Sequence, residues 1–185
     1  MTNNVSTLLT NRIAQGDIIR DVEYIEAAIE NSGVVEISKI IFPYVVVLTQ
    51  ECDLQWDFES RLEGSGTGST QDKYLLSVIV APLYNAEHVF AGNHLDKIGR
   101  TMVRKSSDQK KILKNNETPR YHYIEFPQNV TIVPSVVDFK HYFTVNVEYL
   151  MDHKRKNFVC SVNPIFREHL CQRFSNFLSR IGLPV

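Results

Sequence analysis

The segment at residues 44–54, YVVVLTQECDL, constrains the fold of this chain more than any other stretch. Its first five residues form an uninterrupted apolar run rich in β-branched side chains. Such a run is typical of a strand buried on both faces, or of a strand at the centre of a small barrel. It ends abruptly in five polar or reactive residues: Thr49, Gln50, Glu51, Cys52 and Asp53. A buried strand that ends in polar side chains is a common way to mount a functional site.

Two interpretations of this polar end remain open. In the first, Thr49 and Asp53 cap a turn, and Cys52 packs as a small hydrophobic side chain. In the second, residues 49–53 form one wall of a cleft that they share with Asp17, at the start of the first strand. Asp17 and Asp53 would then face each other, which would raise one carboxyl pKa or bind a divalent cation.

The length of 185 residues and the 43% hydrophobic content predict one compact domain. The chain has 20 Lys and Arg against 21 Asp and Glu, so its net charge of -1 indicates no partner, and only local clustering can. Its three cysteines form no CxxC pair and no signal peptide is apparent, which favours a reduced, cytoplasmic protein. The longest apolar runs are shorter than the ~20 residues of a membrane helix, so we expect no membrane partner.

Residues 74–82, YLLSVIVAP, predict a second continuously buried strand. Further strands are expected at residues 18–19, 34–37, 119–126, 130–133, 136–139, 142–147 and 158–162, with a turn at residues 31–33. Residues 24–29 fit either a strand or a helical turn. The glycine-rich stretch at residues 63–70 lacks the lysine of a phosphate-binding loop, which favours a mobile loop that could act as a lid.

Helical spacing of apolar residues appears in two regions. Residues 86–114 predict two helices that are broken near Ser106. A C-terminal helix should begin at Asn163 and Pro164 and end at Gly182. One face of this helix is apolar and should dock on the barrel or on a second copy: Phe166, Leu170, Phe174, Phe177 and Ile181. Its Arg173 and Arg180 share another face, which is either solvated or an anion-binding row.

Positive charge gathers between residues 97 and 120. Eight basic residues lie there, against only Asp108 and Glu117: Lys97, Arg100, Arg104, Lys105, Lys110, Lys111, Lys114 and Arg120. Tyr121 and Tyr123 follow at once and could stack on bases. The candidate nucleic-acid-binding residues are therefore Arg104, Lys105, Lys110, Lys111, Arg120 and Tyr121. The alternative is a solvated helix face.

Cys52 could act as a nucleophile if a base lay close to it. Its neighbours Glu51 and Asp53 oppose this role, because negative charges raise a thiol pKa. Among the histidines, His122 and His141 fall in predicted strands and are the two candidates to serve such a site. The candidate catalytic residues are Asp53, Cys52, Thr49 and His141, and the other cleft residues are Asp17, Gln50 and Glu51. The histidines show no HxH or HExxH spacing, so we predict no metal site, and nothing in the sequence calls for a cofactor.

Three segments, in this order, resemble the PemK/MazF-type growth-inhibiting toxins. They are Gly16-Asp17-Ile18 at the first strand, VVVLTQECD at residues 45–53, and VIVAPL at residues 78–83. The resemblance covers roughly the first half of the chain, with a continuation at residues 137–150. It implies a small SH3-like β-barrel, a homodimer as in most of the family, and cleavage of single-stranded RNA as in many members.

The family's catalytic residues are not matched. Its arginine falls near Phe143 and its aspartate near Asn146, although Thr144-Val145 fits the pattern. Tyr84 and Asn85 stand where the family places Thr and Ser. A chain that lacks the cationic stabiliser and the acid/base group cannot run that chemistry in that way. The layout is more similar to uncharacterised bacterial proteins with a GDI…CDL…RxGLP pattern, which here ends at residues 180–184.

We therefore predict an α+β protein. An SH3-like barrel should form from residues 1–84 and 119–162, with a basic helical insertion at 85–118 and a C-terminal docking helix at 163–185. The first expected function is binding or cleavage of single-stranded RNA in a bacterial toxin–antitoxin or phage-defence setting. The alternatives are a hydrolase centred on Cys52 and Asp53, or a non-catalytic subunit of a defence complex. RNA, a partner protein or antitoxin, and a second copy are the partners left open.

Overall fold

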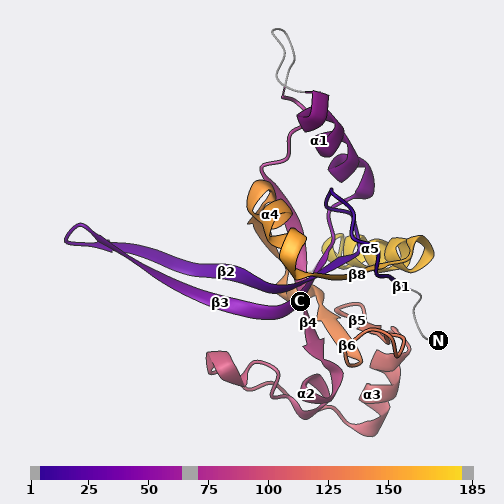
Figure 1. Ribbon diagram of the computed structural model, residues 1–185. Coiled ribbons are helices and arrows are strands. Elements are labelled where there is room, and N and C mark those ends of the chain that lie inside the picture. The colour runs from indigo at the N-terminus through magenta and orange to yellow at the C-terminus, as the bar shows by residue number, and fades with distance from the viewer. Residues whose placement is uncertain (1–4, 64–70, 181–185) are drawn as a thin grey trace.

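The computed structural model describes residues 5–63 and 71–180 and contains one curled antiparallel sheet with helices around it (Figure 1). The strands are β1 (Val5–Ser6), β2 (Asp17–Asn31), β3 (Val34–Val47), β4 (Ser77–Asn85), β5 (Tyr121–Ile124), β6 (Ser135–Asp138), β7 (Phe143–Asn146) and β8 (Phe158–Val162). The helices are α1 (Glu51–Glu63), α2 (Ala86–Ala91), α3 (Ser107–Lys114), α4 (Val147–Asn157) and α5 (Pro164–Leu178), with short 3-10 turns η1 (Asp96–Ile98) and η2 (Phe139–His141). The order across the sheet is β1-β8-β2-β3-β4-β6-β5, and β7 also pairs with β4. The α+β class is thus confirmed.

The two continuously apolar runs are adjacent strands, as expected. β3 and β4 pair antiparallel, with Val46 opposite Ala81. Val46 packs into one core cluster, whereas Val45 and Val47 pack into another. Because successive side chains of a strand point to opposite faces, a strand covered on both faces needs apolar residues at every position. The helices α1 and α4 contribute Leu54 and Leu150 to the second cluster.

Helix α5 covers the first cluster, as its apolar face predicts. Leu170 and Phe174 are buried, and the Phe174 ring lies 5.5 Å from the ring of Phe139. The helix ends at Leu178, and the expected stop at Gly182 lies outside the described residues. Arg173 is not a solvated side chain, because it donates hydrogen bonds to the carbonyls of Thr118 and Tyr121.

The most unexpected element is a long hairpin of β2 and β3 that projects from the body of the molecule (Figure 1). The two strands have 15 and 14 residues, where the sequence predicted separate short strands. The expected turn is confirmed: Ser32 and Gly33 have φ values of 53° and 82°, which suits a two-residue hairpin loop. Residues 34–37 are exposed, although the alternation predicted a half-buried strand. We call residues 22–42 the arm.

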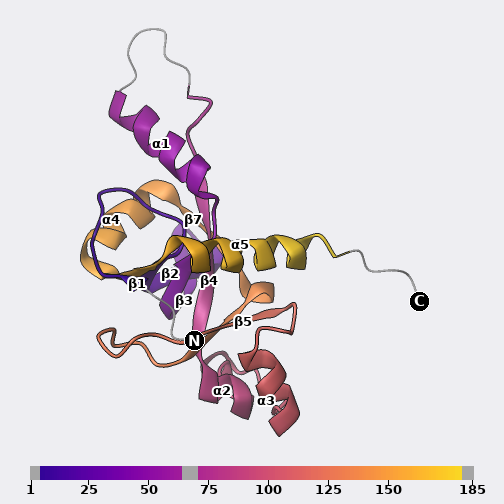
Figure 2. The same ribbon diagram turned by 90° about the vertical axis from the view of Figure 1, so that its right-hand side faces the viewer.

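Residues 86–120, which extend the basic insertion predicted at 85–118 to Arg120, lie at one end of the molecule and α1 lies at the other (Figure 2). We call residues 86–120 the insertion. Its first helix is shorter than predicted, because α2 ends at Gly92 in a left-handed conformation, φ 81°. A Cβ at Gly92 would lie 2.2 Å from the carbonyl oxygen of Met102, so only glycine fits there. The predicted break is confirmed: Ser106 begins α3 with a capping box to Gln109.

Two other elements differ from the sequence expectation, and a third segment cannot be compared. Residues 51–63 form helix α1, so the polar end of the central strand is a helix start rather than a loop. Residues 130–133 form no strand, although Val130 and Ile132 are buried. Most of the glycine-rich stretch, residues 64–70, lies outside the described residues. No helix in the part of the chain that the structure describes has the length and hydrophobicity needed to cross a membrane.

Candidate active site at the root of the arm

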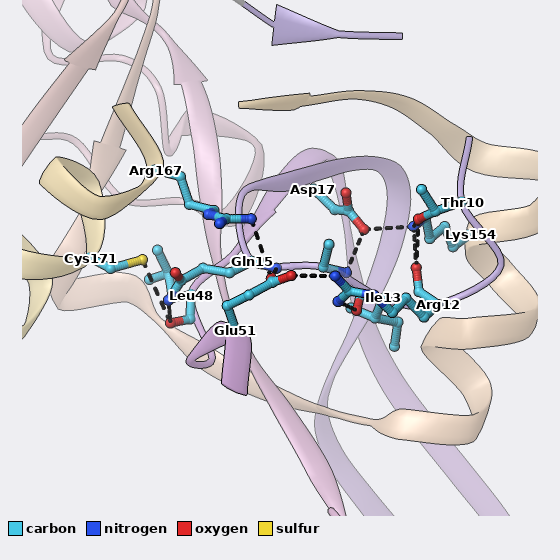
Figure 3. Close-up of polar contacts among 11 residues, drawn as sticks. Thr10, Arg12, Ile13, Gln15, Asp17, Leu48, Glu51, Lys154, Arg167 and Cys171 are labelled. Atoms are coloured by element: carbon cyan, nitrogen blue, oxygen red, sulfur yellow. Dashed lines mark hydrogen bonds and ion pairs between the residues drawn. The ribbon is translucent and has the colours of Figure 1, made fainter. Parts of the chain in front are cut away.

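Of the five residues that follow the central strand, Glu51 joins a polar network and lines a pocket of about 210 Å³ together with Asp17 (Figure 3). Glu51, in the first turn of α1, accepts a hydrogen bond from the backbone N–H of Gln15 at 2.8 Å. It also forms ion pairs with Arg12 and, at 3.4 Å, with Arg167 of α5. Glu51 therefore ties the segment before β2 to two helices, which is a structural task.

Asp17 pairs with a lysine and not with Asp53. Its carboxylate lies 2.7 Å from Nζ of Lys154 on α4, and the two side chains are 1% and 2% exposed (Figure 3). Burial raises the pKa of Asp17, and the ammonium of Lys154 opposes that shift. Lys154 also donates to the hydroxyl of Thr10. The prediction that Asp17 faces Asp53 is thus wrong, because the buried ammonium of Lys154 pairs with Asp17 instead.

The remaining residues of the predicted cleft do not come together. The hydroxyl of Thr49 is buried and accepts the backbone N–H of Ile79 at 2.7 Å. Gln50 and Cys52 are exposed, and Asp53 is partly exposed in the first turn of α1. In the described chain, Sγ of Cys52 contacts only Gln50 and Asp53, at 3.7 and 3.8 Å. A thiol next to a carboxylate, with no base in contact, is poorly placed to act as a nucleophile.

A cavity of about 430 Å³ lies elsewhere, between the root of the arm and the insertion. It is lined by Tyr24, Glu26, Ile40, Phe42, Tyr84, Leu95, Ile98, Arg100, Lys140, His141, Tyr142 and Phe143. The volume is in the range of sites for small ligands. The lining brings together aromatic rings, two cations and the predicted catalytic residue His141.

His141 belongs to a chain of polar contacts behind this cavity. Its Nδ1 lies 3.1 Å from the hydroxyl of Tyr84 and 3.5 Å from the carboxylate of Asp138. Asp138 is buried and also accepts two hydrogen bonds from the guanidinium of Arg120. If Nδ1 carries the proton, it donates toward Tyr84 and Asp138, and Nε2 is left as an acceptor. This arrangement orients a histidine as other sites orient a general base.

Burial favours the neutral form of the two imidazoles at this site, those of His141 and His94. Burial lowers the pKa of His141, although the carboxylate of Asp138 opposes the shift. Burial likewise lowers the pKa of His94, whose ring packs edge-on against Tyr84 with centroids 4.9 Å apart. Neither ring nitrogen of His94 has a hydrogen-bond partner among residues 5–63 and 71–180. Burial raises the pKa of Tyr84, so its hydroxyl stays protonated. The cluster therefore offers neutral bases beside a phenol.

Aromatic side chains at the root of the arm form one wall of the cavity. The Tyr24 ring lies 5.1 Å from that of Phe143, and the Phe42 ring lies 5.4 Å from it. Phe42 also packs edge-on against Tyr84. Aromatic pairs of this kind stabilise one another. These contacts therefore fix the rings that line the cavity where the arm joins the body.

The insertion holds several of its cations against its own aromatic rings. Lys105 and Arg120 lie over Tyr121, at 5.4 and 4.9 Å from the ring centroid. Lys110 lies over Phe90 at 5.5 Å. Arg104 and Lys111 are exposed. The predicted nucleic-acid-binding residues thus divide into those that also stabilise the insertion and those that face solvent. Tyr121 is buried, so stacking of its ring on a base, one of the uses predicted for it, has no access.

Sequence reasoning missed most of this cavity. His141 follows Tyr84 by 57 residues and meets it through the pairing of β4 with β6 and β7, whereas His94 packs on Tyr84 from the loop after α2. Arg100 was noticed as part of the basic stretch, whereas Lys140, next to His141, was not singled out. The usable signals were His141, which was already a catalytic candidate, and the Tyr84-Asn85 pair, which ends the buried strand β4.

No cluster of three or more His, Cys, Asp or Glu side chains suited to a metal ion occurs among residues 5–63 and 71–180. No protein-family model matches the chain, and a comparison with curated proteins finds no relative.

Proposed function

We propose that this protein binds single-stranded RNA in the cavity at the root of the arm and cleaves it there. The observation that carries the proposal is the lining of that cavity, which combines aromatic rings, the cations Arg100 and Lys140, and the oriented imidazole of His141. Stacking on aromatic rings and neutralisation of phosphates are the two ways in which proteins hold single strands. The curled antiparallel sheet and the resemblance to PemK/MazF-type toxins support the same substrate class through an SH3-like barrel.

In this proposal, His141 replaces the acid/base residue that the resemblance fails to match. Nε2 of His141 accepts the proton of the ribose 2′-hydroxyl while the 2′-oxygen attacks the adjacent phosphorus atom. Arg100 and Lys140 stabilise the charge on the phosphate oxygens, and the departing 5′-oxygen takes a proton from water. Asp138 and Arg120 are positioning residues, because Asp138 contacts the ring of His141 and Arg120 holds Asp138, whereas Tyr84 contacts His141 and also lines the cavity. The products are a 2′,3′-cyclic phosphate and a free 5′-hydroxyl.

Binding can be tested by titrating a labelled single-stranded RNA with the protein at several salt concentrations. Replacing Arg100 and Lys140 by Ala should weaken binding and reduce the slope of log affinity against log salt by roughly 0.7 per lost phosphate contact. Arg155→Ala with Lys156→Ala is the matched control, because these two cations are exposed on α4, outside the cavity lining. An equal loss in both double variants would mean that the RNA follows overall charge and not this cavity.

The contribution of the insertion needs a separate variant. Changing Arg104, Lys105, Lys110 and Lys111 together to Ala should also lower the salt slope if this surface guides the strand into the cavity. Lys105 and Lys110 additionally pack on aromatic rings, so the thermal unfolding of this variant must be recorded alongside. An unchanged salt slope in a folded variant would mean that these four side chains are only solvated and do not contact RNA.

Cleavage is tested by His141→Gln, which keeps a polar side chain and removes the base. RNA affinity should stay within about twofold, whereas the cleavage rate should fall by roughly 10²–10⁴, the usual contribution of a general base. Retained cleavage by a purified His141→Gln protein would remove the histidine from the mechanism. Cys52→Ser should cleave like the wild type, and a loss there would instead favour the hydrolase alternative centred on Cys52 and Asp53.

A further inference from the structure

The arm exposes more aliphatic surface than a free β-ribbon tolerates. Six aliphatic side chains on it are between 53% and 62% exposed: Ile25, Ile29, Val34, Val35, Ile37 and Ile41. The pairs in which β2 contacts β8 and β3 contacts β4 all lie before Arg20 and after Tyr44. Both edges of the arm therefore lack a neighbouring strand in the described chain. Two-stranded ribbons are at best marginally stable in water, and open apolar edges invite another chain.

The charge of the arm indicates which kind of surface could cover it. Residues 22–42 carry four carboxylates against the single cation Lys39: Glu23, Glu26, Glu30 and Glu36. Phosphate backbones repel such a surface, so a nucleic acid is excluded as the partner of the outer arm, beyond the cavity-lining residues Tyr24 and Glu26. A second arm stacked directly on the first would meet the same excess of carboxylates and be repelled in the same way. The complementary surface must be cationic and must offer some apolar contact.

The insertion of this protein has both properties. Its eight cations are opposed by few carboxylates, and Arg104 and Lys111 among them are exposed. Two aliphatic side chains, Val103 and Ile112, are 76% and 41% exposed in the same segment. The arm's own insertion is not within reach of its tip, because the arm points away from the body (Figure 1). A second copy of the chain can supply the insertion instead.

We propose that two copies form a dimer in which the arm of each docks on the basic insertion of the other. A two-fold axis makes both contacts at once, so each copy contributes one arm and one insertion. The arm is about 30 Å long and about 10 Å wide from strand geometry, which gives about 300 Å² per face. Two arms on two insertions bury about 1,200 Å² in total, the lower end of stable protein interfaces. This inference does not depend on RNA binding or cleavage.

The test uses charge reversal on each surface and needs no RNA. One variant carries Glu30→Lys and Glu36→Lys on the arm, and the other carries Arg104→Glu and Lys111→Glu on the insertion. All four side chains are exposed, so both variants should fold, which circular dichroism checks. We expect the wild type to sediment as a dimer at micromolar concentration and low salt. Each variant alone should sediment as a monomer.

Mixing the two variants decides the question. In the mixed dimer, the lysine arm meets the glutamate insertion and the native arm meets the native insertion, so both contacts are restored and a heterodimer should form. A monomeric wild type overturns the proposal. A dimer that survives in the insertion variant also overturns it, because direct pairing of arms would leave that variant unaffected. Failure of the mixture to dimerise, with both variants folded, overturns it as well.

Discussion

At the scale of single residues, the pair of Asp17 and Lys154 places two opposite charges in the interior of the protein. Neither side chain reaches solvent, and each compensates the desolvation of the other. The pair joins the start of β2 to α4, and Lys154 also contacts the segment at Thr10. Asp17 looked like a functional carboxylate in the sequence, and the structure gives it a partner that makes it structural.

Lys154→Met should lower the free energy of unfolding by about 3–5 kcal/mol, because it leaves the carboxylate of Asp17 buried without a cation. Urea unfolding at pH 7 measures the change. The double variant Asp17→Asn with Lys154→Met is the control, since it removes both charges and should recover a large part of the loss. A single variant as stable as the wild type would show that Asp17 is solvated or protonated at that pH.

His122 should make stability depend on pH. Its pKa is lowered to about 3, first by burial and then by the charges of Arg173 and His169. The folded protein therefore keeps His122 neutral while the unfolded chain protonates it below about pH 6.5. Stability should fall as the pH drops from about 6.5 toward 3, by up to roughly 1.4 kcal/mol per pH unit from this residue.

The variant His122→Gln isolates this contribution from the carboxylates that titrate in the same range. It should lose less stability than the wild type between pH 7 and pH 5 in urea unfolding. Parallel pH profiles for the two proteins would mean that His122 gains a proton-accepting neighbour or water when it is charged in the fold.

At the scale of elements, α5 depends on one aromatic contact more than on its caps. Asn163 makes no side-chain cap hydrogen bond, whereas Phe174 is buried against Phe139 and Tyr142. Phe174→Ala should therefore destabilise the protein by roughly 3–5 kcal/mol in urea unfolding. Leu178→Ala, an exposed position on the same helix, is the control and should change stability by less than about 0.5 kcal/mol. A wild-type midpoint for Phe174→Ala would show that α5 is not part of the core.

The apolar strands and helix of the core were predictable from sequence, whereas helix α1 and the arm were not. The apolar runs of β3 and β4 and the apolar face of α5 each carry their burial in their own residues. The arm was missed because its aliphatic residues suggest burial that the single chain does not provide. The candidate site was missed in most of its parts because Tyr84, His94 and His141 converge only through tertiary pairing. Of these three, only His141 was a catalytic candidate, and it lies in the 3-10 turn η2 and not in the predicted strand.

At the scale of the whole molecule, the body should fold without the arm. No residue between 26 and 38 is buried, so replacing these residues by an Asn-Gly turn removes no core contact. In dilute protein the urea midpoint should stay near that of the wild type, with one cooperative transition. Sedimentation of the same variant at higher concentration should show a monomer. A large drop in the midpoint would mean that the arm stabilises the body it leaves.

The strand order has a consequence for how the chain is made. β2 pairs with β8, so Ile18 cannot pair with Cys160, nor Asp17 with Lys154, until the carboxyl-terminal part of the chain has been synthesised. During synthesis at about 5–20 residues per second, the amino-terminal strand is complete many seconds before either partner leaves the ribosome. The hairpin of β2 and β3 is local and can form early. The apolar start of β2 stays exposed until β8 has been synthesised and pairs with it. Chaperones that bind exposed apolar strands should therefore engage nascent chains of this protein until residues near 162 have emerged.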